Sequence, residues 1–484
     1  MMIISTLIIL LSFISVILLI ITNKLNRAVA SLASAMVCYF VLVFLEQNDF
    51  SLIVDLIFGN QEDGYVNLHS ITLIISMMFI VAISHEAGVF QFIAMNLIKF
   101  SKGKPVLLLI IFSFITLFVS AVLNNILAVI ILIPLTITVS RILNINPSPH
   151  ILTQAILVNI GGTLFSISSI PNILITTFAN ITFIEFFLNV GLISLIIFCF
   201  SLAFFILLYK DQLKSVDLTK TLEILKDFNV WNLVQNRKLL YESMASLLIL
   251  FILFIIIPSN LITPDILALV MAIFLIIISR LNPKELFSKI DLELILYLIG
   301  IFIIAGALES TGLLNLFGYL ISQLGGGDTY ILIILILWIS ALLSSSIDNI
   351  PITKVMIPVI GNINNINPDS FGNTFFYSLS IGANWGDNLT PLGDNILVIS
   401  LAEQNKRSIS FNQFFRLGFF TTIYQLSIIS LLFTLIYQPI LAIIIIILLL
   451  IVIGSLYLTY KVSKENYFKY IGNKLHKIRN FITE

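Results

Sequence analysis

A cluster of polar side chains interrupts a long apolar run at residues 344–354, which read Ser-Ser-Ser-Ile-Asp-Asn-Ile-Pro-Ile-Thr-Lys. A lone Asp or Lys at the centre of a membrane costs about 2.5–3.5 kcal/mol on insertion scales. Such groups persist in hydrocarbon only where they line a cavity or are satisfied by partners. A second stretch, Ser-Ala-Val-Leu-Asn-Asn-Ile-Leu at 120–127, interrupts its own apolar run in the same way. The oxygen atoms of these side chains could hold a small cation.

The two stretches belong to an internal repeat with an offset of 224 positions. Ser120, Asn124 and Asn125 recur as Ser344, Asp348 and Asn349, and Gly88 and Pro134 recur as Gly312 and Pro358. Downstream, Asn-Ile-Gly-Gly-Thr at 159–163 matches Asn-Trp-Gly-Asp-Asn at 384–388. Glycine tolerates unusual backbone angles and proline removes a donor, so we expect a broken helix in each copy. Freed carbonyl groups there suit cations, whereas the N-termini of half-helices suit anions.

Side chains distinguish the two copies. The second copy carries Asp348, Asp387 and Asp394 near Lys354. The first copy has neutral residues at the corresponding positions, namely Asn124, Gly162 and either Ser169 or Pro171. Three carboxylates against one ammonium favour binding of Na⁺ or H⁺ over a naked polyanion.

Each of these charges also has a purely structural interpretation. Asp348 could cap the second arm of its hairpin, and Asp394 could cap a half-helix that begins near Asn395. Lys354 could pair with an acid and hold the hairpin rigid. His85 and Glu86 fall near the centre of the span 70–98, and Glu309 falls at the matching place in the second copy. They could form a proton path, or a hydrogen-bonded pair that holds helices together.

We therefore expect an ion or substrate site that draws on both copies. Its candidate residues are Ser120, Asn124, Asn125, Asn159, Gly161, Gly162, Thr163, Asn172, Ser344, Asp348, Asn349, Asn384, Asp387, Asn388, Thr390 and Asp394, with His85, Glu86, Glu309 and Lys354 as a proton path or as charge partners. We expect no catalytic residue and no cofactor, apart from Na⁺ as a coupling ion at the hairpin tips.

Composition defines the elements that must position these residues. The chain is 59% hydrophobic and 10% charged, whereas soluble domains carry about 25% charged residues. Apolar runs of 18 or more residues recur, which predicts an all-α polytopic membrane protein of about 11 transmembrane helices. Lys and Arg gather in alternate loops and in the tail, so the positive-inside rule places the N-terminus outside and the C-terminus in the cytoplasm. Cys38 and Cys199 lie in apolar runs and indicate no disulfide framework.

Two runs are best explained as re-entrant hairpins. Residues 106–139 would make a helix of about 51 Å, too long for a core of about 30 Å, and basic residues flank both ends. Residues 330–360 repeat the pattern from the opposite side. The predicted organisation is 1–69, N-terminal scaffold helices; 70–208, first inverted repeat with hairpin 106–139 and broken helix 151–178; 209–238, cytoplasmic linker; 239–290, scaffold helices; 291–437, second repeat with hairpin 330–360 and broken helix 374–400; and 438–484, last helix and basic tail.

Inverted repeats with discontinuous helices are typical of secondary transporters, whose sites lie at the midplane between the repeats. Phosphate-loop, His-Glu-x-x-His and Gly-x-Ser-x-Gly patterns are absent from the sequence, which argues against an enzyme. A channel-like protein is the alternative from another class. The lipid bilayer and a small ion or anion are the expected partners, and nucleic acid is not.

Several motifs carry a family resemblance. They are Ser-Ala-Val-Leu-Asn-Asn at 120–125, Arg-Ile-Leu-Asn-Ile-Asn-Pro at 141–147, Asn-Ile-Gly-Gly-Thr at 159–163 with Pro171-Asn172, Ser-Ser-Ser-Ile-Asp-Asn-Ile-Pro at 344–351, and Gly-Ala-Asn-Trp-Gly-Asp-Asn-Leu-Thr-Pro-Leu-Gly at 382–393. They resemble the ion transporter superfamily, and above all its ArsB/NhaD-type permeases, relatives of the citrate and dicarboxylate carriers.

The resemblance covers about residues 23–433. It implies a homodimer in the plasma membrane that moves a transport domain, elevator fashion, against a scaffold. It also implies that Asn125, Asn159, Asn349 and Asn384 help to form ion sites. The activity expected is Na⁺- or H⁺-coupled transport, such as Na⁺/H⁺ antiport. Efflux of arsenite or another inorganic anion, or transport of a small carboxylate, is the alternative on the same scaffold.

Overall fold

The computed structural model describes residues 2–22, 24–61, 63–102, 104–213, 230–234, 236–391, 395–405, 407 and 409–462. Over these ranges the chain is helical and contains no strand. Eight of the described helices are long and apolar enough to cross a membrane, and shorter apolar helices stand beside them. The prediction of an all-α polytopic membrane protein is therefore confirmed.

The first repeat contains one helical hairpin and one broken helix. Its helices are α4 (Val66–Glu86), α5 (Val89–Phe100), α6 (Pro105–Ser120), α7 (Asn125–Ile142), α8 (Ser148–Gly161), α9 (Ile170–Phe178), α10 (Phe183–Phe186), the π-helical turn η1 (Phe187–Gly191) and α11 (Leu192–Leu208). Helices α6 and α7 form the hairpin, and α8 and α9 are the halves of the broken helix. The four-residue link between α6 and α7, residues 121–124, is called here the first tip.

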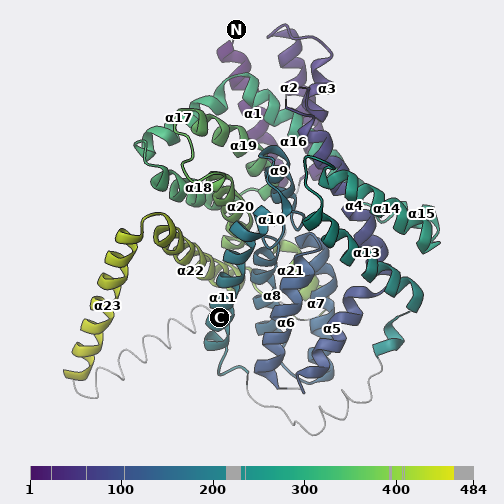
Figure 1. Cartoon of the computed structure of the whole chain (residues 1–484), viewed down its shortest axis with the longest axis vertical. Coiled ribbons are helices and arrows are strands. Elements are labelled where there is room, and N and C mark those ends of the chain that lie inside the picture. Colours follow the sequence, from purple (N-terminus) through teal and green to yellow (C-terminus); the bar gives the residue numbers. More distant parts are fainter. Residues whose placement is uncertain are drawn as a thin grey trace.

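The second repeat has the same order of elements. Its helices are α16 (Leu292–Ser310), α17 (Leu313–Gly325), α18 (Thr329–Ser344), α19 (Asn349–Ile366), α20 (Thr374–Gly386), the 3-10 turn η3 (Asp387–Leu389), α21 (Asn395–Gln404) and α22 (Phe411–Tyr437). The link between α18 and α19, residues 345–348, is the second tip. In Figure 1, α6, α7 and α8 lie together in the lower part of the molecule, and α17, α18 and α19 lie together in the upper part.

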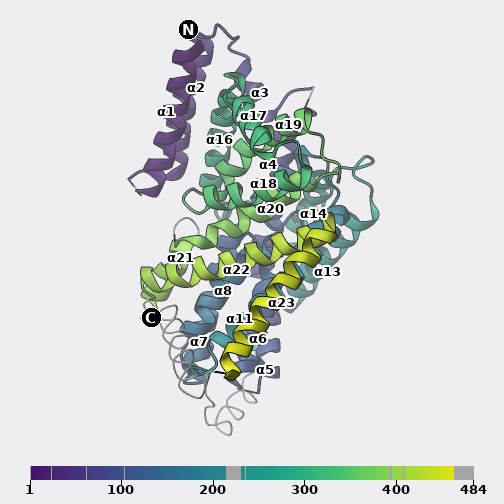
Figure 2. The same ribbon diagram turned by 90° about the vertical axis from the view of Figure 1, so that its left-hand side faces the viewer.

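The remaining helices flank the repeats. They are α1 (Met2–Ile21), α2 (Arg27–Phe44), α3 (Leu52–Phe58), the 3-10 turn η2 (Val230–Leu233), α13 (Arg237–Ile256), α14 (Pro264–Ser279), α15 (Pro283–Phe287) and α23 (Pro439–Val462). Helix α2 packs along α1 and α16, and α14 packs along α4. Figure 2 shows α1 and α2 as a pair beside the upper part of the molecule, while α5, α6 and α7 occupy the lower part.

One local prediction was wrong. The span 70–98 is not a single helix, because α4 ends at Glu86 and α5 begins at Val89. Gly88 between them has φ 77°, and Gly312 at the matching corner between α16 and α17 has φ 74°. Residues with a side chain rarely adopt this positive φ angle, so glycine permits the turn. Helices α5 and α17 have 12 and 13 residues, about 18–20 Å, and are too short to cross a core of about 30 Å.

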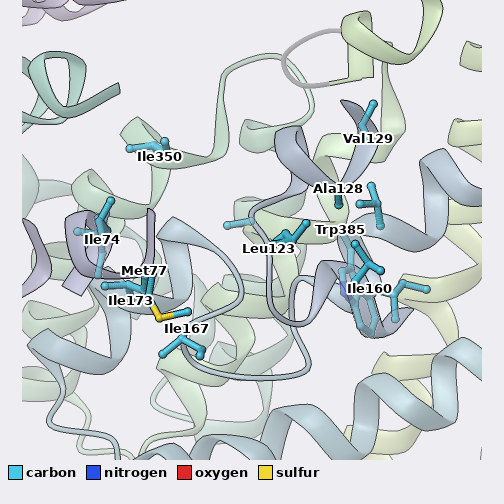
Figure 3. Packing of buried hydrophobic residues seen from close by; sticks show 14 of the residues in the cluster. Ile74, Met77, Leu123, Ala128, Val129, Ile160, Ile167, Ile173, Ile350 and Trp385 are labelled. Atoms are coloured by element: carbon cyan, nitrogen blue, oxygen red, sulfur yellow. The ribbon is translucent and has the colours of Figure 1, made fainter. Parts of the chain in front are cut away.

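Apolar packing fixes the tips against their neighbours. Figure 3 shows Ile74 and Met77 of α4 gathered with Ile167 and Ile173 of the first broken helix. Figure 3 also shows Leu123 of the first tip, and this side chain is fully buried. The polar tips therefore sit within apolar surroundings, where any unpaired polar group is costly.

Candidate functional site

The two tips meet at a small cavity of about 30 Å³. Both copies contribute to its wall. The lining residues are Arg27, Asn124, Asn125, Ile126, Ser169, Ile170, Pro171, Leu294, Asp348, Asn349 and Ile350. Asn124, Asn125, Asp348 and Asn349 were predicted from the sequence, and they come together here.

Three helices begin at this cavity. Asn124 caps α7 by accepting a hydrogen bond from the Leu127 amide at 2.9 Å, and Asp348 caps α19 by accepting from the Ile350 amide at 3.3 Å. Ser169 caps α9. Each helix N-terminus carries unpaired amide groups and a partial positive charge of about half a unit. The convergence therefore favours an anion, and Asp348 caps α19, which is one of the two interpretations predicted for it.

Arg27 adds a full positive charge at the same place. It is the first residue of α2, and Leu294 in the cavity wall belongs to the first turn of α16. In the sequence, Arg27 is one of the basic residues that follow the first apolar run, and it served there only to orient the chain in the membrane. No signal in the sequence singled it out, because a basic residue at the cytoplasmic end of a span is expected in any membrane protein.

Behind the first tip, amide side chains form a continuous hydrogen-bonded chain. Asn125 donates from Nδ2 to Oδ1 of Asn159, and Asn159 donates from Nδ2 to Oδ1 of Asn388 at 2.7 Å. Asn388 in turn donates to the Ile156 carbonyl at 3.0 Å. All three asparagines are buried. This chain joins the first tip, the first broken helix and the second broken helix.

The second tip lacks the corresponding chain. Asn349 holds the position of Asn125 and lines the cavity. Asn384 holds the position of Asn159, but its Nδ2 donates to Asn172 Oδ1 at 2.9 Å and to the Ser380 carbonyl at 2.8 Å. The Oδ1 atom of Asn384 is buried and has no hydrogen-bond partner within the described part of the chain. A buried amide oxygen without a donor suits a cation as its partner.

Three other hydrogen bonds recur in both repeats: two fix each hairpin to its broken helix, and the third joins the two halves of that broken helix. Ser120 donates to the Val158 carbonyl, and Ser344 donates to the Ala383 carbonyl in the same way. Ser168 donates to the Ala121 carbonyl, and Thr390 donates to that of Ser345. Asn172 donates to the Gly162 carbonyl, and Asn395 donates to that of Asp387. The matching partners differ by 222–225 positions. The two copies therefore share one local architecture.

Glycines allow the tips to approach the broken helices closely. A Cβ on Gly161 would lie 2.8 Å from the Leu117 carbonyl oxygen and from Ser120 Cβ. A Cβ on Gly386 would lie 2.3 Å from the Ala341 carbonyl oxygen. At Gly162 it would lie 2.7 Å from Asn125 Oδ1, whereas the second copy carries the buried Asp387 at that position.

Thr163 has other surroundings. Thr163 accepts a hydrogen bond from the Trp385 ring nitrogen at 3.0 Å and contacts Ser194 at 2.9 Å, so it joins the two repeats away from the cavity. Asp394 lies outside the described residues.

The four residues suggested as a proton path or as charge partners do not line the cavity. Glu86 is exposed at the end of α4 and forms an ion pair with Lys289, and His85 beside it is exposed. Glu309 is exposed near the end of α16. Lys354 donates to Asn67 Oδ1 at 2.6 Å and lies over the Phe302 ring at 4.8 Å. The expectation that His85 and Glu86 lie mid-span was wrong because Gly88 ends the helix there.

Comparison with known proteins gives a consistent result. A family model described as citrate transporter matches residues 17–382. The 46 kDa membrane protein of Mycobacterium leprae is 29% identical over 413 residues, covering 85% of this chain and 94% of that protein. An uncharacterized transporter of Mycobacterium tuberculosis is 28% identical over 434 residues, 89% of this chain and 98% of that protein. The human P protein is 25% identical over 438 residues, 73% of this chain and 52% of that protein.

Proposed function

Because this chain belongs to the citrate transporter family within the ion transporter superfamily, we propose that it is a secondary transporter that carries a small carboxylate anion together with Na⁺ or H⁺. Membrane transport follows from the family. The substrate, the coupling ion and the mechanism are the parts that we propose.

The convergence of helix N-termini on the cavity is the main observation that supports an anionic substrate. Helices α7, α9 and α19 begin at the cavity, and Arg27 lines it. Amide groups at a helix N-terminus bind carboxylate and phosphate groups without further side chains. A carboxylate matches this arrangement better than a naked cation does.

The second tip supports a coupling cation. Asp348 faces the cavity, and Asn384 Oδ1 is buried without a donor. We propose that Na⁺ or H⁺ neutralises the Asp348 carboxylate and that Asn384 and Asp387 supply further oxygen atoms for Na⁺. The first tip has no acid at the matching position, and its asparagines already bond one another. Coupling would then depend on the second tip.

We propose an elevator movement between two states. Arg27 and Leu294 belong to the first turns of α2 and α16, the ends that the charge pattern assigns to the cytoplasm. Both tips lie beside these ends, and we propose that this arrangement is the state in which the transport domain is displaced towards the cytoplasm. The cavity of about 30 Å³ has room for roughly one or two waters and is too small for a tricarboxylate. The tips would therefore have to separate from α2 and α16 to admit the substrate.

Flux in proteoliposomes tests this proposal. Labelled citrate, smaller dicarboxylates and arsenite are offered in turn, with a Na⁺ gradient, a pH gradient or neither. Uptake of a carboxylate that follows one cation gradient is the expected result. Dissipation of a pH gradient by Na⁺ or Li⁺ without any anion would instead establish Na⁺/H⁺ antiport, which the acids of the second tip favour. Cation-independent flux at open-pore rates would contradict both.

Asp348→Asn is the decisive variant in that assay. We expect it to lose the dependence of flux on the cation gradient, because a neutral amide cannot exchange a proton and binds Na⁺ less tightly. Asp49→Asn serves as a matched control, because Asp49 is an exposed acid between α2 and α3 that does not line the cavity. A fully coupled Asp348→Asn protein would remove this acid from the mechanism.

We also propose that the chain works as a homodimer in the plasma membrane, with its N-terminus outside and its C-terminus in the cytoplasm. The family resemblance and the sorting of basic residues support this. The mass of the protein in nanodiscs, and proteolysis from either side of sealed vesicles, would test the two statements separately.

A further inference from the structure

Arg27 lies between two acids at the start of α16 and one acid of the second tip. Its Nη2 atom lies 3.2 Å from Asp291 Oδ2, and its Nε atom lies 3.2 Å from Glu293 Oε1. Its guanidinium also lies over the Tyr297 ring at 5.7 Å. These three partners belong to α16 or its cap, against which α2 packs. The guanidinium is thus held at the N-terminus of α16, independently of the tips.

From the other side, the second tip presents Asp348 to the same guanidinium. Arg27 and Asp348 are the charged side chains among the described residues that line the cavity. Both side chains face the same space of about 30 Å³, so their opposite charges lie across one small cavity. Counting Asp291 and Glu293, three carboxylates surround one guanidinium. The side chains near the cavity therefore carry an excess of negative charge when Asp348 is ionised.

This balance opposes an anionic substrate. A substrate carboxylate in so small a cavity would lie beside the ionised Asp348, and like charges at such short range repel strongly. Neutralising Asp348 removes this repulsion. It also removes the negative charge that Asp348 presents to Arg27 across the cavity, while Asp291 and Glu293 keep the guanidinium in place.

We propose that Arg27 exchanges partners during transport: it pairs with Asp348 when the second tip holds no cation, and with a carboxylate of the substrate once a cation has neutralised Asp348. This inference rests on the proposed function and adds to it the residue that makes cation and anion binding interdependent. A residue of α2 thereby completes the site only while the tips lie beside its N-terminus.

The exchange predicts a reciprocal linkage. If the cation raises the affinity for the anion by some factor, the anion must raise the affinity for the cation by the same factor. Both variants of the pair should abolish the linkage, but in opposite ways. Asp348→Asn imitates the neutralised acid and should bind the anion tightly without cation. Arg27→Gln removes the guanidinium and should bind the anion weakly with or without cation.

Equilibrium binding of labelled citrate to the full-length protein in nanodiscs tests the inference. Citrate affinity is measured over a Na⁺ series at fixed pH and over a pH series at fixed Na⁺. For the wild type we expect affinity to rise at least tenfold along one series. For Asp348→Asn we expect the high affinity throughout, and for Arg27→Gln an affinity at least tenfold lower throughout. Arg27→Lys, which keeps the charge but not the fork of donors, should recover part of the rise.

Arg280→Gln is the matched control, since Arg280 is an exposed residue at the end of α14, and it should behave as the wild type. A monodisperse size-exclusion profile for each variant verifies folding. Full cation dependence in Arg27→Gln would overturn the exchange while leaving the proposed function intact. Wild-type dependence in Asp348→Asn would overturn both the exchange and the proposed role of Asp348 in coupling, while cation-coupled carboxylate transport itself would stand. Absence of citrate binding by the wild type under every condition would overturn both.

Discussion

The contact between α18 and α20 offers a sharp test of how the second tip is held. Gly386 ends α20, and an added Cβ there would lie 2.3 Å from the carbonyl oxygen, 2.4 Å from Cα and 2.7 Å from the carbonyl carbon of Ala341. Ordinary van der Waals contacts begin at 3.4 Å. Gly386→Ala would therefore have to move the two helices apart by about 1 Å, the difference between 3.4 and 2.3 Å. Backbone atoms cannot rotate away as a flexible side chain can.

Overpacking of this kind costs typically 1–3 kcal/mol, and more where backbone must move. Gly361→Ala is the matched control, because an added Cβ at that position of α19 meets nothing within 4 Å. Inside a helix, replacing Gly by Ala stabilises by about 0.5–1 kcal/mol. The two variants should thus differ by about 1.5–4 kcal/mol, obtained by adding these ranges.

The assay is thermal unfolding of the purified protein, followed by size-exclusion chromatography of heated samples, together with flux in proteoliposomes. Gly386→Ala should lower the midpoint temperature and Gly361→Ala should leave it unchanged or raise it. Gly386→Ala should also reduce flux, because separation of the helices strains the hydrogen bond from Ser344 to the Ala383 carbonyl at 2.6 Å. Equal midpoints for the two variants would refute the close packing described for this tip.

Two further substitutions test the polar interior. Asn388→Ala should destabilise the protein by about 1–3 kcal/mol for each partner left unpaired, since Asn159 Nδ2 and the Ile156 carbonyl both lose their bonds. The control Asn405→Ala removes only a bond to Leu401 and should cost less. Equal melting temperatures for the two variants would contradict the asparagine chain. Thr153→Val should destabilise by about 1 kcal/mol through loss of a shared buried water, because the Thr153 hydroxyl and His150 Nδ1 are buried without a protein partner in the described ranges. An unchanged or raised melting temperature for Thr153→Val would exclude that water.

The sequence predicted the class of the protein because each signal was repeated along the chain. Long apolar runs and sorted basic loops recur many times, so single ambiguous residues do not alter the result. The same holds for the resemblance of 120–125 to 344–349, which lie at matching turns of the two hairpins. Local polarity inside an apolar run was a reliable guide to residues that face a cavity, as Asn124 and Asp348 do.

Other features could not be predicted, for identifiable reasons. Gly88 in an apolar run is compatible with a continuous helix, and only its φ of 77° separates α4 from α5. Arg27 obeys the positive-inside rule wherever it points, so its approach to Asp348 depends on how α2 packs on α16. The count of three acids against Lys354 left out Arg27, and Lys354 itself bonds Asn67.

The two repeats show how one architecture can perform two tasks. Their tips are tied to their broken helices by matching hydrogen bonds, so the frame is nearly the same in both. Within that frame the first copy holds Asn124 and Gly162, and the second holds Asp348 and Asp387. Neutral groups let the asparagines of the first copy bond one another and fix the interface between repeats. We propose that acids in the second copy create a charge that a cation must neutralise before an anion can approach. A symmetric pair of acidic tips would bind cations twice but leave no place for an anion; a symmetric pair of neutral tips would bind the anion with nothing to couple it. The asymmetry is therefore what joins cation binding to anion binding in the transporter proposed here.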